Sequence, residues 1–310
     1  MPDAPLARYT SDEVAQRTGV PPEQAKRLWR ALGFADAGDE AVYTDEDVEA
    51  VRTVADVLGS GLLDLDMAVN LTRGLGLSMA RLAEWEVSAL VHRLDEQLQS
   101  EAGAPVPFRA AAEQFANTFN PSFERLMVYA WRRHMVNAMV RLDAADEANT
   151  IQVTVGFADI VSFTALSNTL SEEKIGDLVE LFESRCADVV ALQKGRVIKS
   201  LGDSVLFVNE DPIQALDTAE GIINVVGRDP RMPDVRVGIA TGSVVLRMGD
   251  VFGPPVNMAA RLTAVARRNR IIIDEHTATL LPADQFETRR LPARPVRGFG
   301  VLEPVAVMRH

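Results

Sequence analysis

The chain has 310 residues, of which 47% are hydrophobic and 25% are charged, so it can form about two folded domains and is not wholly disordered. The formal net charge of −12 argues against general nucleic-acid binding and against attraction to an anionic membrane. Cys186 is the only cysteine, which excludes an internal disulfide or a cysteine-built metal cage, and we expect a reducing cytoplasm as the setting.

Capping residues and apolar spacing predict that the first hundred residues are helical. Thr10 or Ser11 is suited to cap the first helix and Gly19 to end it. Gly33 closes the second helix, and Thr44 caps the third. The predicted helices lie near 12–17, 22–32, 45–58, 66–73 and 79–98. We therefore expect residues 1–100 to form an all-α domain.

A linker and a long helix are predicted over 101–149. The segment EAGAPVPF forms a break that contains proline and glycine, and Asn120 and Pro121 are suited to start the helix. Apolar residues then recur in steps of three and four, at Val128, Trp131, Met135, Ala138 and Leu142. Such a row is suited to pair two parallel helices, and it is also suited to pack one helix on its own domain.

From residue 150 the pattern changes to short strands and helices. Strands are predicted near 151–155, 196–201, 204–208, 235–241 and 244–248, and helices near 172–193, 212–226 and 255–267. The order β-α-β-β-α-β predicts an α+β domain with a ferredoxin-like core over 150–310, in which helices cover one face of a sheet.

Two aspartates are expected at strand ends of this domain. Asp159, in GFADIVSFTALS, follows a buried strand, and the N–H groups near 161–164 are suited to receive phosphate oxygens. Asp203, in GRVIKSLGDSVLF, lies at a hairpin tip, four residues after Lys199. Two carboxylates so placed are suited to hold hard divalent cations. Taken singly, Asp159 also fits a plain helix cap, and Asp203 a plain turn residue.

A third motif, RVGIATGSVVLRMGDVFGPPVNMAARL, covers 236–262. Asp250 precedes a Gly-Pro-Pro bend, and Asn257 and Arg261 are four residues apart, so they share one face of the predicted helix. An amide and a guanidinium on one face suit phosphate or ribose oxygens. Capping and surface pairing would also account for these residues.

Together, FADIVSFT, KSLGD and GDVFGPPVNMAARL, in this order, resemble the catalytic domain of class III nucleotidyl cyclases, over about half the chain. The N-terminal helical domain fits the actinobacterial type of adenylyl cyclase. The resemblance implies metal ligands, base-reading residues, residues for the ribose and the reacting phosphorus, and further substrate contacts. The implied metal ligands are Asp159, Asp203 and the carbonyl of Ile160, and the implied base-reading residues are Lys199 and Asp250. The residues implied for the ribose and the reacting phosphorus are Asn257 and Arg261, and the implied further substrate contacts are Phe163, Thr164 and Arg297.

The polarity of the base-reading pair favours ATP over GTP. Asp250 can accept from the N6 amino group of adenine, and Lys199 can donate to N1. Guanine reverses both polarities, and each buried polar group left unpaired costs about 1–3 kcal/mol.

The resemblance also implies a mechanism and an assembly. Two Mg²⁺ or Mn²⁺ ions per site would support attack of the ribose 3′-OH on the α-phosphorus, giving cyclic AMP and pyrophosphate. In this family the metal aspartates and the base-reading residues of one site come from opposite subunits. A head-to-tail homodimer with two shared sites is therefore implied.

Residues 9–34 are similar to a helix-turn-helix of the MerR type. Its predicted second helix offers only Lys26, Arg27 and Arg30 as cations, which equips it poorly for DNA. We expect a regulatory, autoinhibitory domain instead. The alternatives are a DNA-binding regulator with a catalytically silent, nucleotide-sensing cyclase-like domain, and a diguanylate cyclase, which the lack of a GGDEF-like string opposes.

Overall fold

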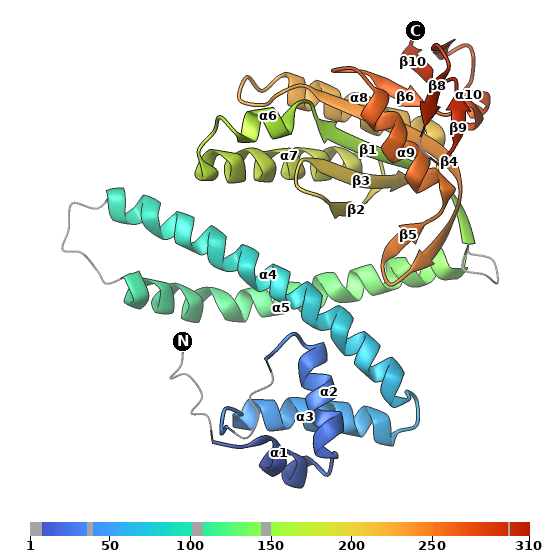
Figure 1. The fold of residues 1–310 in the computed structure, drawn as a ribbon. Helices are drawn as coiled ribbons and strands as arrows, with labels where there is room; N and C mark the ends of the chain where they lie inside the picture. Colours follow the sequence, from blue (N-terminus) through green and yellow to red (C-terminus); the bar gives the residue numbers. More distant parts are fainter. Residues whose placement is uncertain (1–7, 36–39, 101–107, 144–149, 297) are drawn as a thin grey trace. The chain divides into compact units, whose positions relative to one another are not determined.

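The computed structural model describes residues 8–35, 40–100, 108–143, 150–296 and 298–310 (Figure 1). Contacts divide the chain into two compact units, Met1–Val136 and Asn137–His310. The first unit contains only helices among its named elements, and the second contains the sheet. The expected helical N-terminal half and α+β C-terminal half are therefore confirmed.

The first three helices begin and end where their capping residues predict. They are α1 (Ser11–Thr18), α2 (Pro22–Ala31) and α3 (Asp45–Gly59). Thr10 and Glu13 form a reciprocal capping box on α1, and Gly19 ends that helix in the left-handed conformation, with φ 72°. Thr44 and Asp47 form the same box on α3.

Two long helices correct the prediction for the rest of this half. The predicted helices near 66–73 and 79–98 are one helix, α4 (Leu65–Ser100), and α5 (Phe108–Asp143) begins well before Pro121 and contains it. Gly76 lies so close to the backbone of Leu32 that a β-carbon there would overlap it. This contact with α2 offsets the poor helix propensity of glycine. Within the described residues, no helix has both the length and the apolar character to cross a membrane.

The second unit is built on a mixed sheet with strand order β2-β3-β1-β4-β6-β10-β7, and β5 pairs with β4. The pairs are antiparallel except β4 with β6. The strands are β1 (Thr150–Ile160), β2 (Arg196–Ser200), β3 (Ser204–Asn209), β4 (Val235–Arg247), β5 (Asp250–Phe252), β6 (Ile271–Ile273), β7 (Phe286–Arg290) and β10 (Val305–Arg309). A separate hairpin pairs β8 (Arg294–Val296) with β9 (Gly300–Leu302).

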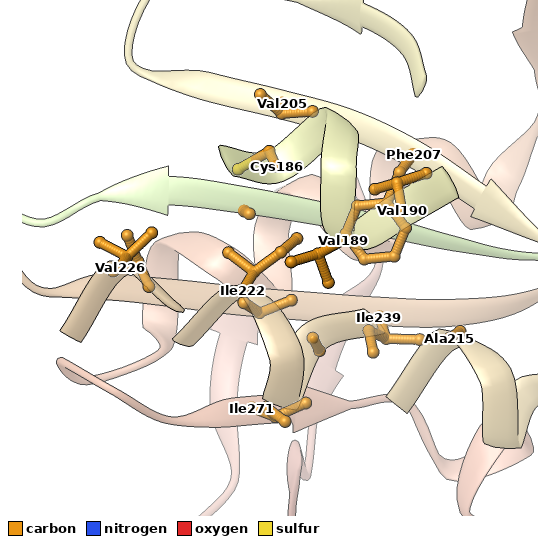
Figure 2. Packing of buried hydrophobic residues seen from close by; sticks show 14 of the residues in the cluster. Cys186, Val189, Val190, Val205, Phe207, Ala215, Ile222, Val226, Ile239 and Ile271 are labelled. Atoms are coloured by element: carbon orange, nitrogen blue, oxygen red, sulfur yellow. The ribbon is translucent and has the colours of Figure 1, made fainter. Parts of the chain in front are cut away.

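Helices pack on both faces of the sheet, not on one as predicted. On one face, α7 (Glu172–Leu192) and α8 (Pro212–Gly227) cover alternate strand residues such as Val205, Phe207 and Ile239 (Figure 2). On the other, α9 (Pro254–Val265) covers the intervening residues, such as Val155 and Leu206. Because β1 is covered on both faces, its residues 153–158 are all buried, although apolar and polar residues alternate at its start.

One long strand replaces two predicted ones. The predicted strands near 235–241 and 244–248 are the single strand β4, because Gly242 and its neighbours stay paired with β1. The short strand β5, which returns along the end of β4, was not predicted. The two remaining helices of this unit are α6 (Phe163–Ser167) and α10 (Glu275–Leu280). Cys186 lies inside α7, where burial raises the pKa of its thiol and makes it an inert apolar residue.

Ile222 tests the role of α8 in this core. It is fully buried against the sheet, whereas Ile223 is only partly buried. Ile222→Ala should lower the free energy of unfolding by about 2–5 kcal/mol, measured by urea denaturation, since a cavity is left in a packed core. Ile223→Ala is the matched control and should cost clearly less. Equal losses in the two variants would contradict the packing of α8.

Candidate active site

Asp159, Asp203 and Arg236 gather at one edge of the sheet, which we call the carboxylate edge. Asp159 is the penultimate residue of β1, and its neighbours across the strands are Ser204 of β3 and Arg236 of β4. The backbone N–H of Ile160 donates to the backbone oxygen of Asp203 at 2.9 Å. The end of β1 is thereby joined to the β2–β3 turn, and the two predicted metal-binding aspartates lie side by side.

Arg236 binds the carboxylate of Asp159 directly. Its Nε and Nη2 lie 2.7 and 2.6 Å from the same Oδ2 atom, and the Asp159 side chain is 16% exposed. Burial raises the pKa of Asp159 above its ordinary value, the bond and charge of Arg236 lower it, and the charge of Asp203 raises it again. Sequence reasoning missed this role of Arg236. The only signal for it in the sequence was a cation near the start of the strand predicted over 235–241.

The carboxylate edge fits a hard divalent cation. Two aspartates are too few for an all-protein cage, and the described residues contain no group of three or more histidine, cysteine or acidic residues placed to hold a metal. Magnesium sites in phosphate-handling proteins commonly use one or two carboxylates and complete the shell with water and substrate phosphate. The carboxylate of Asp159 is stabilised by a neighbouring cation, so a bound metal would take over a role that Arg236 fills here.

The predicted base-reading pair is also brought together. Lys199 of β2 donates through Nζ to Oδ2 of Asp250 at 2.5 Å, and Oδ1 of Asp250 accepts from the N–H of Val251 at 2.8 Å. A register shift lies between Val197 and Lys199. Both charged side chains are partly exposed, at 36% and 26%. Among the described residues, no hydrogen bond links this pair to the carboxylate edge.

Helix α9 holds the other two predicted catalytic residues on its outer side. Pro255, Ala259 and Thr263, each four residues apart, are buried against the sheet, whereas Asn257 and Arg261 are exposed. The buried row and the exposed pair lie on different faces of the helix because of its 3.6-residue period. The exposed amide and guanidinium are therefore free to contact a ligand.

Glycines of β4 set the distance between α9 and the sheet. A β-carbon on Gly238 would overlap the backbone nitrogen of Thr263 and the backbone oxygen of Ala259. At the other end, a β-carbon on Gly242 would lie 2.8 Å from Cγ of Pro255. Only glycine permits this approach without moving the helix.

The remaining predicted ligands divide into two groups. The short helix α6 follows Ser162, which has a left-handed φ of 60°. The N–H of Val161 donates to Asp234, so it is not free for a phosphate as predicted. The backbone N–H groups of Phe163 and Thr164 lie in the first turn and precede any intrahelical acceptor. Arg297 lies outside the described residues.

Comparisons with known proteins give a family match and relatives of this chain. Residues 146–308 match the family described as the adenylate and guanylate cyclase catalytic domain. The chain is 36% identical to an adenylate cyclase of Streptomyces coelicolor and 35% identical to one of Streptomyces griseus, in each case over 98% of this chain and 86% of that protein. Among solved structures, the catalytic core of a rhodopsin-guanylyl cyclase with converted specificity, in complex with ATPαS, aligns at 23% identity and a TM-score of 0.50. That match covers 53% of this chain and 99% of the other, and shows the fold.

Gly238→Ala tests whether close packing positions α9. The added methyl group must push α9 away from β4, and overpacking of this kind costs about 1–3 kcal/mol. We expect a lower melting temperature and faster hydrogen exchange in α9. Gly227→Ala is the control, because a β-carbon there meets nothing within 4 Å. Unchanged exchange in α9 of the Gly238 variant would contradict the positioning role.

Proposed function

Because the chain belongs to the adenylate and guanylate cyclase catalytic-domain family, we propose that it is an adenylate cyclase that forms 3′,5′-cyclic AMP and pyrophosphate from ATP. The observation that carries the proposal is the Lys199–Asp250 pair, a donor and an acceptor that are bonded to each other and partly exposed. The names of the Streptomyces relatives, which match nearly the whole chain, support the same activity.

The Lys199–Asp250 pair suits adenine by polarity. The carboxylate of Asp250 accepts a hydrogen bond from the N6 amino group, and the ammonium group of Lys199 donates one to N1. Their mutual bond in the free protein keeps the two groups oriented until the base replaces it. Guanine carries an acceptor at position 6 and a donor at N1. The acceptor Asp250 would then face an acceptor, and the donor Lys199 would face a donor. The cost of about 1–3 kcal/mol for each unpaired group gives a strong preference for ATP.

The triphosphate and the ribose are bound by the other residues. Asp159, Asp203 and the carbonyl of Ile160 would hold two divalent cations, Mg²⁺ or Mn²⁺, which supply charge neutralisation and a more acidic ribose hydroxyl when bound. Arg236 at the carboxylate edge and Arg261 on α9 add cations, as would Arg297, while N–H groups of Phe163 and Thr164 are available to phosphate oxygens. Asn257 orients the ribose through its amide.

The reaction is an in-line displacement at the α-phosphorus. The ribose 3′-oxygen forms a bond to this phosphorus, the bond to the bridging oxygen of the β-phosphate breaks, and pyrophosphate leaves with the electron pair. The hydroxyl proton passes to solvent water. Arg261 stabilises charge on the five-coordinate phosphorus, and Asn257 holds the sugar so that attack is in line. No side chain is needed as a dedicated base.

We also propose a head-to-tail homodimer with two shared sites. Each chain then supplies its carboxylate edge to one site and Lys199, Asp250, Asn257 and Arg261 to the other. Helix α5 gives independent support for pairing, because Val128, Trp131, Met135, Ala138 and Leu142 are all exposed on it. An exposed apolar row at this spacing suits a second copy of the same helix.

The first unit is proposed to restrain the catalytic unit. Its helix α2 offers only Lys26, Arg27 and Arg30 as cations for DNA. The complete set of proposed catalytic residues is better suited to an enzyme than to a silent nucleotide sensor. Restraint would hold the two catalytic units away from the paired arrangement that an active site needs.

Asp203→Ala tests the activity. Purified full-length protein with Mg²⁺ or Mn²⁺ should form cyclic AMP from ATP and far less cyclic GMP from GTP. The substitution should lower the rate by at least about 100-fold, since it removes a ligand for ions worth several kcal/mol of transition-state stabilisation. Asp188→Ala, an exposed aspartate on α7, is the control and should keep full activity. No cyclic AMP from the wild-type protein would sink the proposal.

Removal of the first unit tests the restraint. Residues 137–310 and the full chain should be compared at equal concentrations of dimer, determined by light scattering. Release from restraint predicts a higher rate of cyclic AMP formation per dimer in the fragment. A lower rate per dimer would mean that the first unit assembles the active pair and does not inhibit it.

A further inference from the structure

A hollow of about 710 Å³ lies on the α9 face of the sheet, over β6, β10 and β7. We call it the arginine pocket. Its floor is apolar and includes Ile272, Leu291 and Ala306. Ala306 is paired with both Ile272 and Arg289, and residues directly opposite in a sheet point to the same face. The strand register therefore places Arg289 on the same side as the apolar floor.

Cations surround this floor from three segments of the chain. Arg267 and Arg270 follow α9, Arg289 lies on β7, and Arg294 lies on β8. Glu287 is the acidic residue among those that line the pocket. A concentration of positive charge of this kind is unexpected in a chain with a formal net charge of −12.

These arginines lack carboxylate partners. No described residue forms a side-chain hydrogen bond or ion pair with Arg267 or Arg289, and Nε of Arg294 is buried without any hydrogen-bond partner. Nη1 of Arg270 lies 3.8 Å from Sδ of Met308, which is a weak acceptor. A buried donor without a partner is costly unless a ligand or water satisfies it.

Other arginines of the same unit do find carboxylates. Arg290, the neighbour of Arg289 in sequence, also lines the pocket, and it pairs with Glu275 and Glu303. Arg231 pairs with Asp229 at 2.7 Å. Arg290 is therefore compensated by carboxylates, whereas no described carboxylate pairs with Arg267 or Arg289.

The far side of the pocket, which carries Arg289, is separated from the carboxylate edge by several strands. Arg289 lies on β7, four strands from β1, which carries Asp159, and strands are spaced by about 4.8 Å, so roughly 19 Å separates these two strands. Lys199 lies on β2, two strands further in the same direction. On its near side the pocket includes Arg270, whose backbone oxygen accepts from the N–H of Val237, the residue after Arg236.

We propose that the arginine pocket is a second nucleotide-binding site, one that takes a nucleoside diphosphate or triphosphate. Guanidinium groups on three segments match several phosphate oxygens at once, because each presents a planar fork of donors. The aliphatic floor suits the flat face of a base, and the volume lies in the usual range for small-molecule sites. A ligand with only one carboxylate group would leave most of these guanidinium groups without a partner.

The experiment measures ADP binding to the full-length protein by calorimetry in EDTA, which withholds the metals of the proposed catalytic site. The Arg261→Ala background further weakens that site. ADP should still bind, and addition of Arg267→Ala with Arg289→Ala should raise its Kd by at least about tenfold, because charge-assisted bonds are lost. Arg228→Ala, an exposed arginine at the end of α8, is the matched control and should leave the Kd unchanged.

Two results would overturn the proposal. One is an ADP affinity that does not change when Arg267 and Arg289 are both replaced by alanine. Arg289→Glu is a second variant and should weaken ADP binding further. The other is a KM for ATP that rises as much as the Kd for ADP when Arg267 and Arg289 are replaced in the otherwise wild-type chain, since the pocket would then belong to the shared catalytic site. A separate site predicts that this KM stays within about twofold, with the melting temperature of the variant as the check on folding.

Discussion

ATP carries several negative charges, and the chain proposed to bind it has a formal net charge of −12. Long-range attraction therefore cannot supply the affinity, so cations must be placed locally. In the free protein the main charged groups are already compensated: Arg236 by Asp159, and Lys199 by Asp250. Each pair can exchange its internal bond for bonds to substrate or metal. The rest of the site depends on this local balance of charge.

A rigid frame holds these groups in place. Buried residues on both faces of the sheet fix the strand ends, and the contact of Ile160 with Asp203 joins the two aspartates across strands. The close approach of α9 to Gly238 fixes the height of Asn257 and Arg261 above the face of the sheet that α9 covers. Catalytic groups on packed strands and a packed helix lose little entropy when they bind substrate.

Local signals in the sequence predicted much of this structure, and tertiary contacts account for what they missed. The capping residues Thr10 and Thr44 start helices as predicted, because their hydrogen bonds are local. The continuity of α4 through Gly76 could not be predicted, since it depends on the backbone of Leu32. The packing of α9 on the face of the sheet opposite α7 and α8 also could not be predicted, because it depends on tertiary contacts.

The candidate site shows the same division. The motifs led to Asp159, Asp203, Lys199, Asp250, Asn257 and Arg261, and the carboxylate edge and the Lys199–Asp250 pair bring four of them together two by two. The role of Arg236 was missed because its partner is 77 residues away in sequence, and only the register of β1 with β4 makes them neighbours. Spacing along a chain cannot reveal such a contact without the pairing of strands.

A cyclase site shared between two copies of the chain is tested most directly by mixing two inactive variants. Asp203→Ala damages the carboxylate edge, and Arg261→Ala damages the half supplied by the partner. If the halves come from different chains, mixed dimers contain one intact site, and random exchange should restore about a quarter of the wild-type rate of cyclic AMP formation. A mixture no more active than the sum of the two variants would contradict the shared site.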